Sequence, residues 1–143
     1  MQSLPKHGSC FVCGSPNSPG MGVVWYALDD NSMFAEVTLN DAQQGPPGFA
    51  HGGASAALLD EAMGAAVWLA GYRVASVNLN ISYKKPVPLG QPFKVTAQVN
   101  ERNGKKVTAV SEICLADGTL AVSGEGIFVQ APQLFNGLGA GSR

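Results

Sequence analysis

One short segment of the chain contains the residues best suited to chemistry. His51, Gly52 and Gly53 precede an apolar stretch in which Asp60 and Glu61 are the only charged residues between positions 52 and 71. Glycines at the start of a helix let a ligand approach backbone N–H groups that have no partner within the helix, and the helix dipole favours negative charge there. A carboxylate on an apolar helix must face solvent, find a partner or act on a ligand. The segment therefore predicts an anion-stabilising helix start with an acid farther along.

The two acids point in different directions, because adjacent helix positions are about 100° apart. Ala56, Ala57 and Gly64 flank Asp60 at helical spacing and leave room for a substrate beside it. Glu61 could instead extend outward to solvent. The residue pattern alone leaves both acids as candidates, and each feature taken singly has an ordinary explanation as a surface acid or a tight turn.

The elements that position these residues follow from hydrophobic periodicity. Two short strands are predicted at about residues 22–28 and 33–39, a loop without regular structure at 40–50, and a mostly buried helix at 53–69. Strict alternation then predicts a strand with one apolar and one polar face. Its apolar face comprises Val77, Leu79, Ile81 and Tyr83, and its polar face Ser76, Asn78, Asn80 and Ser82.

Three further strands are predicted to follow as an antiparallel meander. Alternating apolar residues mark residues 93–99, 107–115 and 120–129. Asn103-Gly104 and Asp117-Gly118 separate them with the residues that tight hairpin turns prefer. One buried helix against an antiparallel sheet is an α+β domain. We expect an irregular arm at 1–20, the domain at 21–130 and a flexible tail at 131–143.

Composition limits the class of protein. A chain of 143 residues suits one domain, and 45% hydrophobic against 13% charged residues suggests that some surface is hidden between subunits. A net charge of −1 argues against nucleic acid as a partner. No apolar stretch approaches the roughly 18 residues of a membrane span, and the first residues lack a secretory signal, so we expect a cytoplasmic protein.

Three competing motifs lack their necessary context. Residues 53–57 are similar to a serine nucleophile elbow, but both histidines of the chain precede them. His7, Cys10, Cys13 and Cys114 lack the second close pair that zinc sites normally show, so no metal is expected. Glycines at 137–141 do not lie between a strand and a helix, as a phosphate-binding loop would.

The sequence resembles the hotdog-fold acyl-CoA thioesterases of the phenylacetate-pathway (PaaI) type. The similarity lies in HGG at 51–53 with LLDEAMG at 58–64, in NISY at 80–83 with PVPLG at 86–90, and in CFVCG at 10–14 with PGMG at 19–22. It extends from about residue 10 to 129. The resemblance implies a hotdog fold, in which an antiparallel sheet wraps around one long central helix.

The resemblance also implies roles for individual residues. Asp60 would be the catalytic carboxylate, acting as general base on water or as nucleophile. Gly52, assisted by Gly53, would donate a backbone N–H to the thioester carbonyl, while His51 shapes the loop and Ser76 helps to hold water. The site would form across a homodimer, or within a homotetramer, from residues of two subunits. No cofactor is implied.

Two features of the sequence bear on substrate binding: one departure from the family pattern and one set of basic residues. Some relatives have an asparagine six residues before the histidine, where this chain has Gly45, so Gln44 or Gln43 could take over its contact with the carbonyl. Glu61 is a further candidate for substrate contact. Basic candidates for the phosphates of coenzyme A are Arg73, Lys84, Lys85, Arg102, Lys105 and Lys106. Two alternatives to a thioesterase are a non-catalytic acyl-CoA-binding hotdog module and, less favoured because no histidine lies within the helix, a hotdog dehydratase.

Overall fold

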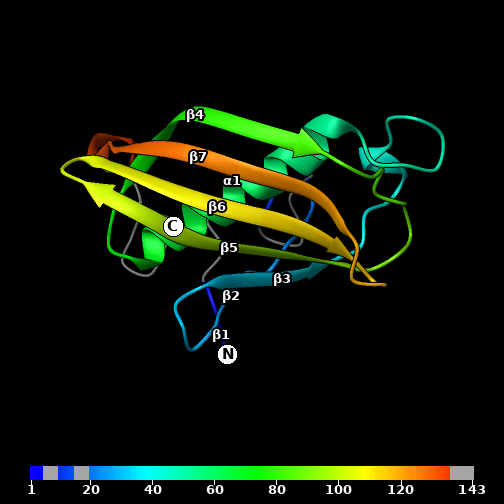
Figure 1. The fold of residues 1–143 in the computed structure, drawn as a ribbon, viewed down its shortest axis with the longest axis horizontal. Helices are drawn as coiled ribbons and strands as arrows, with labels where there is room; N and C mark the ends of the chain where they lie inside the picture. The colour runs from blue at the N-terminus through cyan, green and yellow to red at the C-terminus, as the bar shows by residue number, and fades with distance from the viewer. Residues whose placement is uncertain (5–9, 15–19, 136–143) are drawn as a thin grey trace.

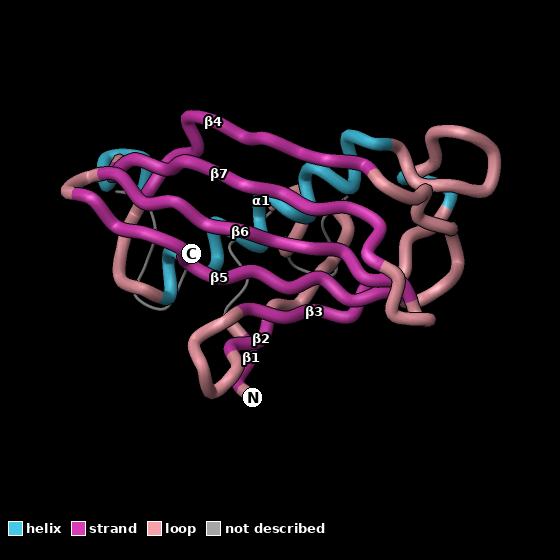
Figure 2. Tube along the Cα trace, in the orientation of Figure 1, coloured by secondary structure: helices cyan, strands magenta, loops and turns pink. Residues whose placement is uncertain are grey.

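A seven-stranded antiparallel sheet and one long helix make up the part of the chain that the computed structural model describes, residues 1–4, 10–14 and 20–135 (Figures 1 and 2). The strand order is β1-β2-β3-β5-β6-β7-β4. The helix α1 runs behind the sheet along one of its faces, and β4 lies at the upper edge in the view of Figure 1. The elements are β1 (Gln2–Ser3), β2 (Tyr26–Ala27), β3 (Met33–Val37), α1 (Gly52–Leu69), β4 (Val74–Tyr83), β5 (Phe93–Asn103), β6 (Lys106–Leu115) and β7 (Leu120–Gln130).

The helix is the centre of the hydrophobic core. It begins at Gly52, one residue before the predicted start, and ends at the predicted Leu69. It contacts β3, β4, β5, β6 and β7. Leu58, Leu59 and Met63 are fully buried, and burial of each such side chain contributes about 1.5–3 kcal/mol. The nearly all-apolar sequence of the helix is therefore explained by a sheet that curves around it.

The predicted meander is confirmed. β5, β6 and β7 pair in succession as antiparallel neighbours. The two predicted turns fall at Gly104 and Gly118, which both have positive φ angles, of 64° and 88°. Phe93, Val95 and Ala97 are buried, as the alternation predicted.

The predicted faces of β4 are partly wrong, because the strand contains a β-bulge. Ser76 lies opposite Phe128 and Asn78 lies opposite Ile127, so Val77 is an extra residue without a partner of its own on β7. Phe128 is buried on the helix side of the sheet, and Ser76 therefore turns to that side as well. Simple alternation had placed Ser76 on the opposite face. Val77 is left 57% exposed.

The segment before the helix also differs from the prediction. The strand expected at 22–28 is reduced to Tyr26–Ala27, although the Val23 N–H still donates to the Val12 carbonyl. The loop at 40–50, predicted to lack regular structure, contains a 3-10 helix at Asp41–Gln43. Asn40 and Gln43 form a capping box there, with each side chain accepting a hydrogen bond from the other end of the turn.

The two ends of the chain are described in part. Within the arm predicted to be irregular, Gln2–Ser3 adds to the sheet as β1, and Val12 and Cys13 are buried. Residues 5–9 of this arm, which include His7, and residues 15–19 lie outside the described residues. The predicted tail begins with a 3-10 helix at Pro132–Phe135, and residues 136–143, with their glycines, are also outside. Across the described ranges, the chain contains no helix with the length and apolar character that a bilayer crossing requires.

Candidate active site

The start of α1 is capped by His51. Its backbone is extended, and its Nδ1 atom accepts a hydrogen bond from the Gly53 N–H at 2.8 Å. This amide is therefore already paired within the chain, whereas the sequence predicted that Gly53 would assist Gly52 at a substrate carbonyl. The Gly52 N–H has no acceptor among the described residues. One backbone donor remains at the helix start.

Tyr83, at the end of β4, packs onto this helix start. Its hydroxyl donates to the Gly52 carbonyl at 2.7 Å. A Cβ atom added to Gly52 would lie 3.4 Å from the ring, so the tyrosine lies directly against the glycine. The sequence alone did not predict this contact. The only available signal was the position of Tyr83 on the apolar face of the predicted strand.

Asp60 lies two turns along the helix and pairs with Ser76 near the beginning of β4. The Ser76 hydroxyl donates to Asp60 Oδ1 at 2.7 Å. Burial raises the pKa of the Asp60 carboxyl, the hydrogen bond from Ser76 lowers it, and the charge of Glu61 raises it further; the net direction is upward. A carboxylate that burial has made more basic is suited to accept a proton.

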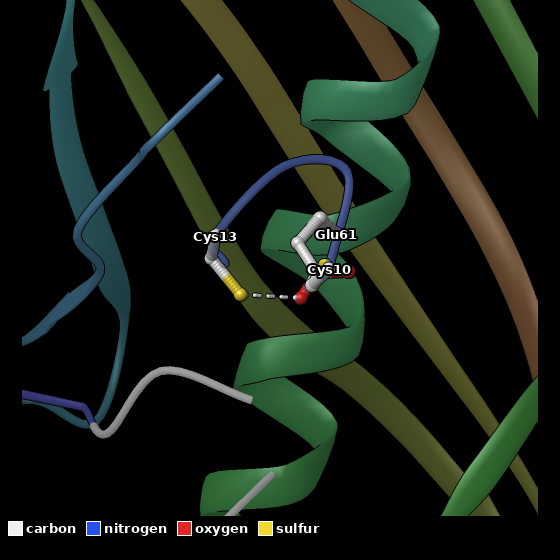
Figure 3. Close-up of side chains that lie close together, drawn as sticks. All are labelled: Cys10, Cys13 and Glu61. Carbon is white, nitrogen blue, oxygen red and sulfur yellow. Dashed lines mark hydrogen bonds between the residues drawn. The ribbon is translucent and has the colours of Figure 1, made fainter. Parts of the chain in front are cut away.

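Glu61 points toward the two cysteines of the N-terminal segment, as Figure 3 shows. Its Oε1 accepts a hydrogen bond from the Cys13 thiol at 3.2 Å. Cys10 lies beside both groups, and hydrogen bonds, chiefly from the Cys13 side chain, lower the pKa of its thiol to about 5 although burial opposes this. The structure thus separates the two acids that the sequence left as equal candidates.

The loop before His51 shows why an asparagine is absent at position 45. A Cβ added to Gly45 would lie 2.7 Å from the His51 Cα, so a side chain cannot fit without movement of the backbone. The Oε1 atoms of the two expected substitutes are used inside the loop. Gln44 accepts from the Gly48 N–H and Gln43 from the Asn40 N–H.

The basic candidates are spread over both ends of the domain. The guanidinium of Arg73 stacks over the Trp68 ring at 3.2 Å, at the far end of α1 from Gly52. Lys84 and Lys85 follow β4 directly, near the helix start, and both are exposed. Arg102 lies over the Tyr72 ring at 5.5 Å, and Lys105 and Lys106 are exposed at the β5–β6 turn.

The catalytic candidates form two clusters within one chain. One contains Asp60 and Ser76, and the other contains His51, Gly52 and Tyr83. Asp60 is eight residues after Gly52 on the helix, a separation of about 12 Å at 1.5 Å per residue. A single carbonyl group cannot touch both clusters of the same chain.

Comparisons with known proteins agree with this architecture. The family model described as Thioesterase superfamily matches residues 47–122. Acyl-coenzyme A thioesterase THEM4 of Bos taurus is 35% identical over 115 residues, which cover 78% of this chain and 47% of the relative. The chain therefore spans less than half the length of this curated relative.

Solved structures show the same fold. The thioesterase superfamily protein RHA08564 has a TM-score of 0.75 and 40% identity, over 78% of this chain and 55% of that chain. The E. coli PaaI protein from the phenylacetic acid degradation operon has a TM-score of 0.72 at 19% identity, over 78% and 80% of the two chains, which shows the fold alone. The hotdog fold that the sequence predicted is confirmed.

Proposed function

Because this chain belongs to the Thioesterase superfamily, we propose that it hydrolyses acyl-CoA thioesters to a free acid and coenzyme A. The observation that carries the proposal is the hydrogen bond between the part-buried carboxylate of Asp60 on the central helix and the Ser76 hydroxyl on β4. The name of the Bos taurus relative supports acyl-CoA as the substrate class.

The proposed reaction uses Asp60 as a general base. The Ser76 hydroxyl occupies Oδ1, which leaves Oδ2 to take a proton from water. The resulting hydroxide adds to the thioester carbon, and the oxygen that becomes negative accepts a hydrogen bond from the Gly52 N–H. The tetrahedral intermediate then breaks its C–S bond, the acid is released, and the CoA thiolate takes up the proton.

We also propose that two subunits supply each site. The ten-residue strand β4 lies at the edge of the sheet, with Val77 57% and Leu79 39% exposed. An unpaired edge of this kind suits pairing with the same strand of a second copy. Asp60 lies under the beginning of β4 and Gly52 under its end, through their contacts with Ser76 and Tyr83.

Antiparallel pairing of two β4 strands would align the beginning of one with the end of the other. Asp60 would then face the partner subunit's Gly52. The separation of about 12 Å between these residues within one chain would no longer prevent one substrate carbonyl from contacting both groups. Lys84 and Lys85, which follow β4 closely, are the basic residues we assign to the phosphates of coenzyme A. Arg73 is already stacked on Trp68 and receives no such role.

Replacement of the carboxylate tests the proposed function. Asp60→Asn keeps the shape of the side chain but removes the base, and we expect the rate of free-thiol release from acyl-CoA to fall about 10²–10⁴-fold. Short, long and aromatic acyl-CoAs are compared. Glu36→Gln, an exposed carboxylate of β3, serves as the matched control and should keep full activity.

Stability provides a second readout for the same variant. Because burial raises the pKa of Asp60, ionisation of this group lowers the free energy of unfolding at neutral pH. The contribution of Asp60 to the free energy of unfolding is therefore greatest below the pKa that it has in the unfolded chain. Asp60→Asn should therefore melt at the same or a higher temperature at neutral pH. Near-normal turnover by a folded variant would exclude Asp60 as the base, and tight acyl-CoA binding without any release by the unaltered protein would identify a binding module instead.

A further inference from the structure

Two cysteines of the N-terminal segment meet an acid of the central helix. The sulfur atoms of Cys10 and Cys13 and a carboxylate oxygen of Glu61 all lie within 4.8 Å of one another (Figure 3). We propose that these three residues bind one zinc ion, which fastens the N-terminal segment to α1. The proposal is independent of the thioesterase chemistry, because neither Asp60 nor Gly52 takes part.

The spacing of the three ligand atoms suits a zinc ion. With Zn–S distances of about 2.3 Å and Zn–O distances of about 2.0–2.2 Å, a tetrahedral site places sulfur and oxygen ligands about 3.5 Å apart. The Cys13 sulfur is 3.2 Å from Glu61 Oε1. All three ligand atoms lie within 4.8 Å of one another, close to the separations that one zinc ion requires.

Hydrogen bonds already link the three proposed ligands. The Cys13 thiol has one hydrogen, yet both Glu61 Oε1 and the Cys10 sulfur lie where they would accept it. Backbone N–H groups of Val12 and Cys13 are also directed at the Cys10 sulfur. A bound metal would replace the shared thiol hydrogen by a direct bond to each ligand.

The segment that contains the cysteines is fixed by its own contacts. The Gly14 N–H donates to the Cys10 carbonyl at 2.9 Å and closes a turn around the pair. The N–H groups of Met21 and Val23 donate to the carbonyls of Phe11 and Val12 at 2.7 and 2.8 Å. Cys13 is only 2% exposed. The site is therefore formed before a metal arrives, which lowers the entropic cost of binding.

The ligand set determines which metal is expected. Two thiolates favour zinc over magnesium or calcium, which prefer oxygen ligands. Three protein ligands leave a fourth tetrahedral position for water or another exchangeable group. The sequence predicted no metal because it contains no second close cysteine or histidine pair. Glu61 is 48 residues from Cys13 and would become a ligand only through the fold.

Metal titration of the whole chain tests the proposal. Metal-free protein, kept reduced and without an affinity tag, is titrated with Zn²⁺ against a chromophoric chelator and separately with Co²⁺. We expect one ion per chain and the near-ultraviolet charge-transfer absorption of cobalt bound to thiolates. Cys10→Ser combined with Cys13→Ser should abolish both signals.

Two single substitutions make the test specific. Glu61→Gln should weaken zinc binding at least about tenfold, since even the loss of an outer-sphere partner costs 10–100-fold. Cys114→Ser removes the remaining cysteine, which lies on β6, and should leave binding unchanged. If the double variant does not fold, the Glu61 variant and the cobalt spectrum still decide the question.

Three results would overturn the proposal. The first is that the reduced protein takes up no stoichiometric zinc. The second is that Glu61→Gln binds zinc as well as the unaltered chain. The third is that Cys10 and Cys13 oxidise to a disulfide in the presence of saturating zinc. Asp60→Asn should bind zinc normally while losing turnover. The failure of one proposal is therefore distinguishable from the failure of the other.

Discussion

A proline at position 52 would remove the single backbone N–H on which the proposed oxyanion site depends. Gly52 is the first residue of α1, a position where proline is favourable because its N–H has no partner within the helix. His51 before it has φ −61° and ψ 138°, the extended conformation that a following proline requires. An added Cβ would meet Tyr83 at 3.4 Å, an ordinary contact distance. Gly52→Pro should therefore fold.

The expected size of the effect follows from the number of donors left at the helix start. Because the Gly53 N–H is occupied by His51, Gly52 supplies the only free amide there among the described residues. Loss of one such donor typically lowers kcat about 10²–10³-fold, or about 3–4 kcal/mol. Gly52→Ala adds the same Cβ but keeps the N–H, so it should retain most of the activity. The ratio of these two variants isolates the amide from the steric effect.

Mixing two inactive variants tests whether the site joins two subunits. When Asp60→Asn and Gly52→Pro chains are unfolded together and refolded, about half of the dimers should contain one chain of each kind. One site of such a mixed dimer has both substitutions and the other has neither. Thiol release should return to about a quarter of the activity of the unaltered protein.

The mixing experiment can also refute the reasoning. If Asp60 and Gly52 of the same chain acted together, each site of a mixed dimer would contain one defect, and activity would stay at the level of the separate variants. Full activity of Gly52→Pro alone would show that this amide does not stabilise the transition state. Either result would remove the basis for a shared site.

Three further predictions concern neighbouring residues. The acidic limb of the pH profile of kcat/KM should lie above the ordinary aspartate pKa of 3.8, because burial raises the pKa of Asp60. Ser76→Ala removes a hydrogen bond that lowers the pKa of Asp60, so this variant should move the limb to higher pH, whereas Ser76→Thr should not. Tyr83→Phe deletes the hydrogen bond to the Gly52 carbonyl and should lower kcat about tenfold or less with little change in KM, as measured by steady-state thiol release. Leu58→Ala opens a cavity under α1 and should lower the free energy of unfolding in urea by about 2–5 kcal/mol; a loss below 1 kcal/mol would contradict the packing described for the core.

The fold was largely predictable because the spacing of apolar residues follows which side chains are buried, and the sheet buries one face of most elements. The helix at 53–69 and the meander after it came from apolar spacing and from the turns at Gly104 and Gly118. The short β2 did not, because its apolar neighbours, such as Val23, pack against the Cys10–Gly14 turn instead of a strand. That turn is distant in sequence, and no local pattern reports it.

The site was predictable only in its parts. The chemistry of Asp60 and of the glycines followed from residue types and the family resemblance. Periodicity alone placed Ser76 on the wrong face, because a bulge at Val77 leaves no mark in the alternation. The hydrogen bond that the Gly53 N–H donates depends on one rotamer of His51, and the partner of Glu61 depends on where the N-terminal segment packs. Such contacts come from tertiary structure, which spacing along the chain does not encode.

The extra residue in β4 also determines how the length of this strand can vary. Val77 has no partner on β7, and the pairs on either side of it, Ser76 with Phe128 and Asn78 with Ile127, are already consecutive on the opposite strand. Deletion of Val77 would let β4 and β7 pair residue for residue and would keep the Ser76 hydroxyl on the helix side. A chain with this deletion would place the hydroxyl six residues before the tyrosine, whereas Ser76 precedes Tyr83 by seven.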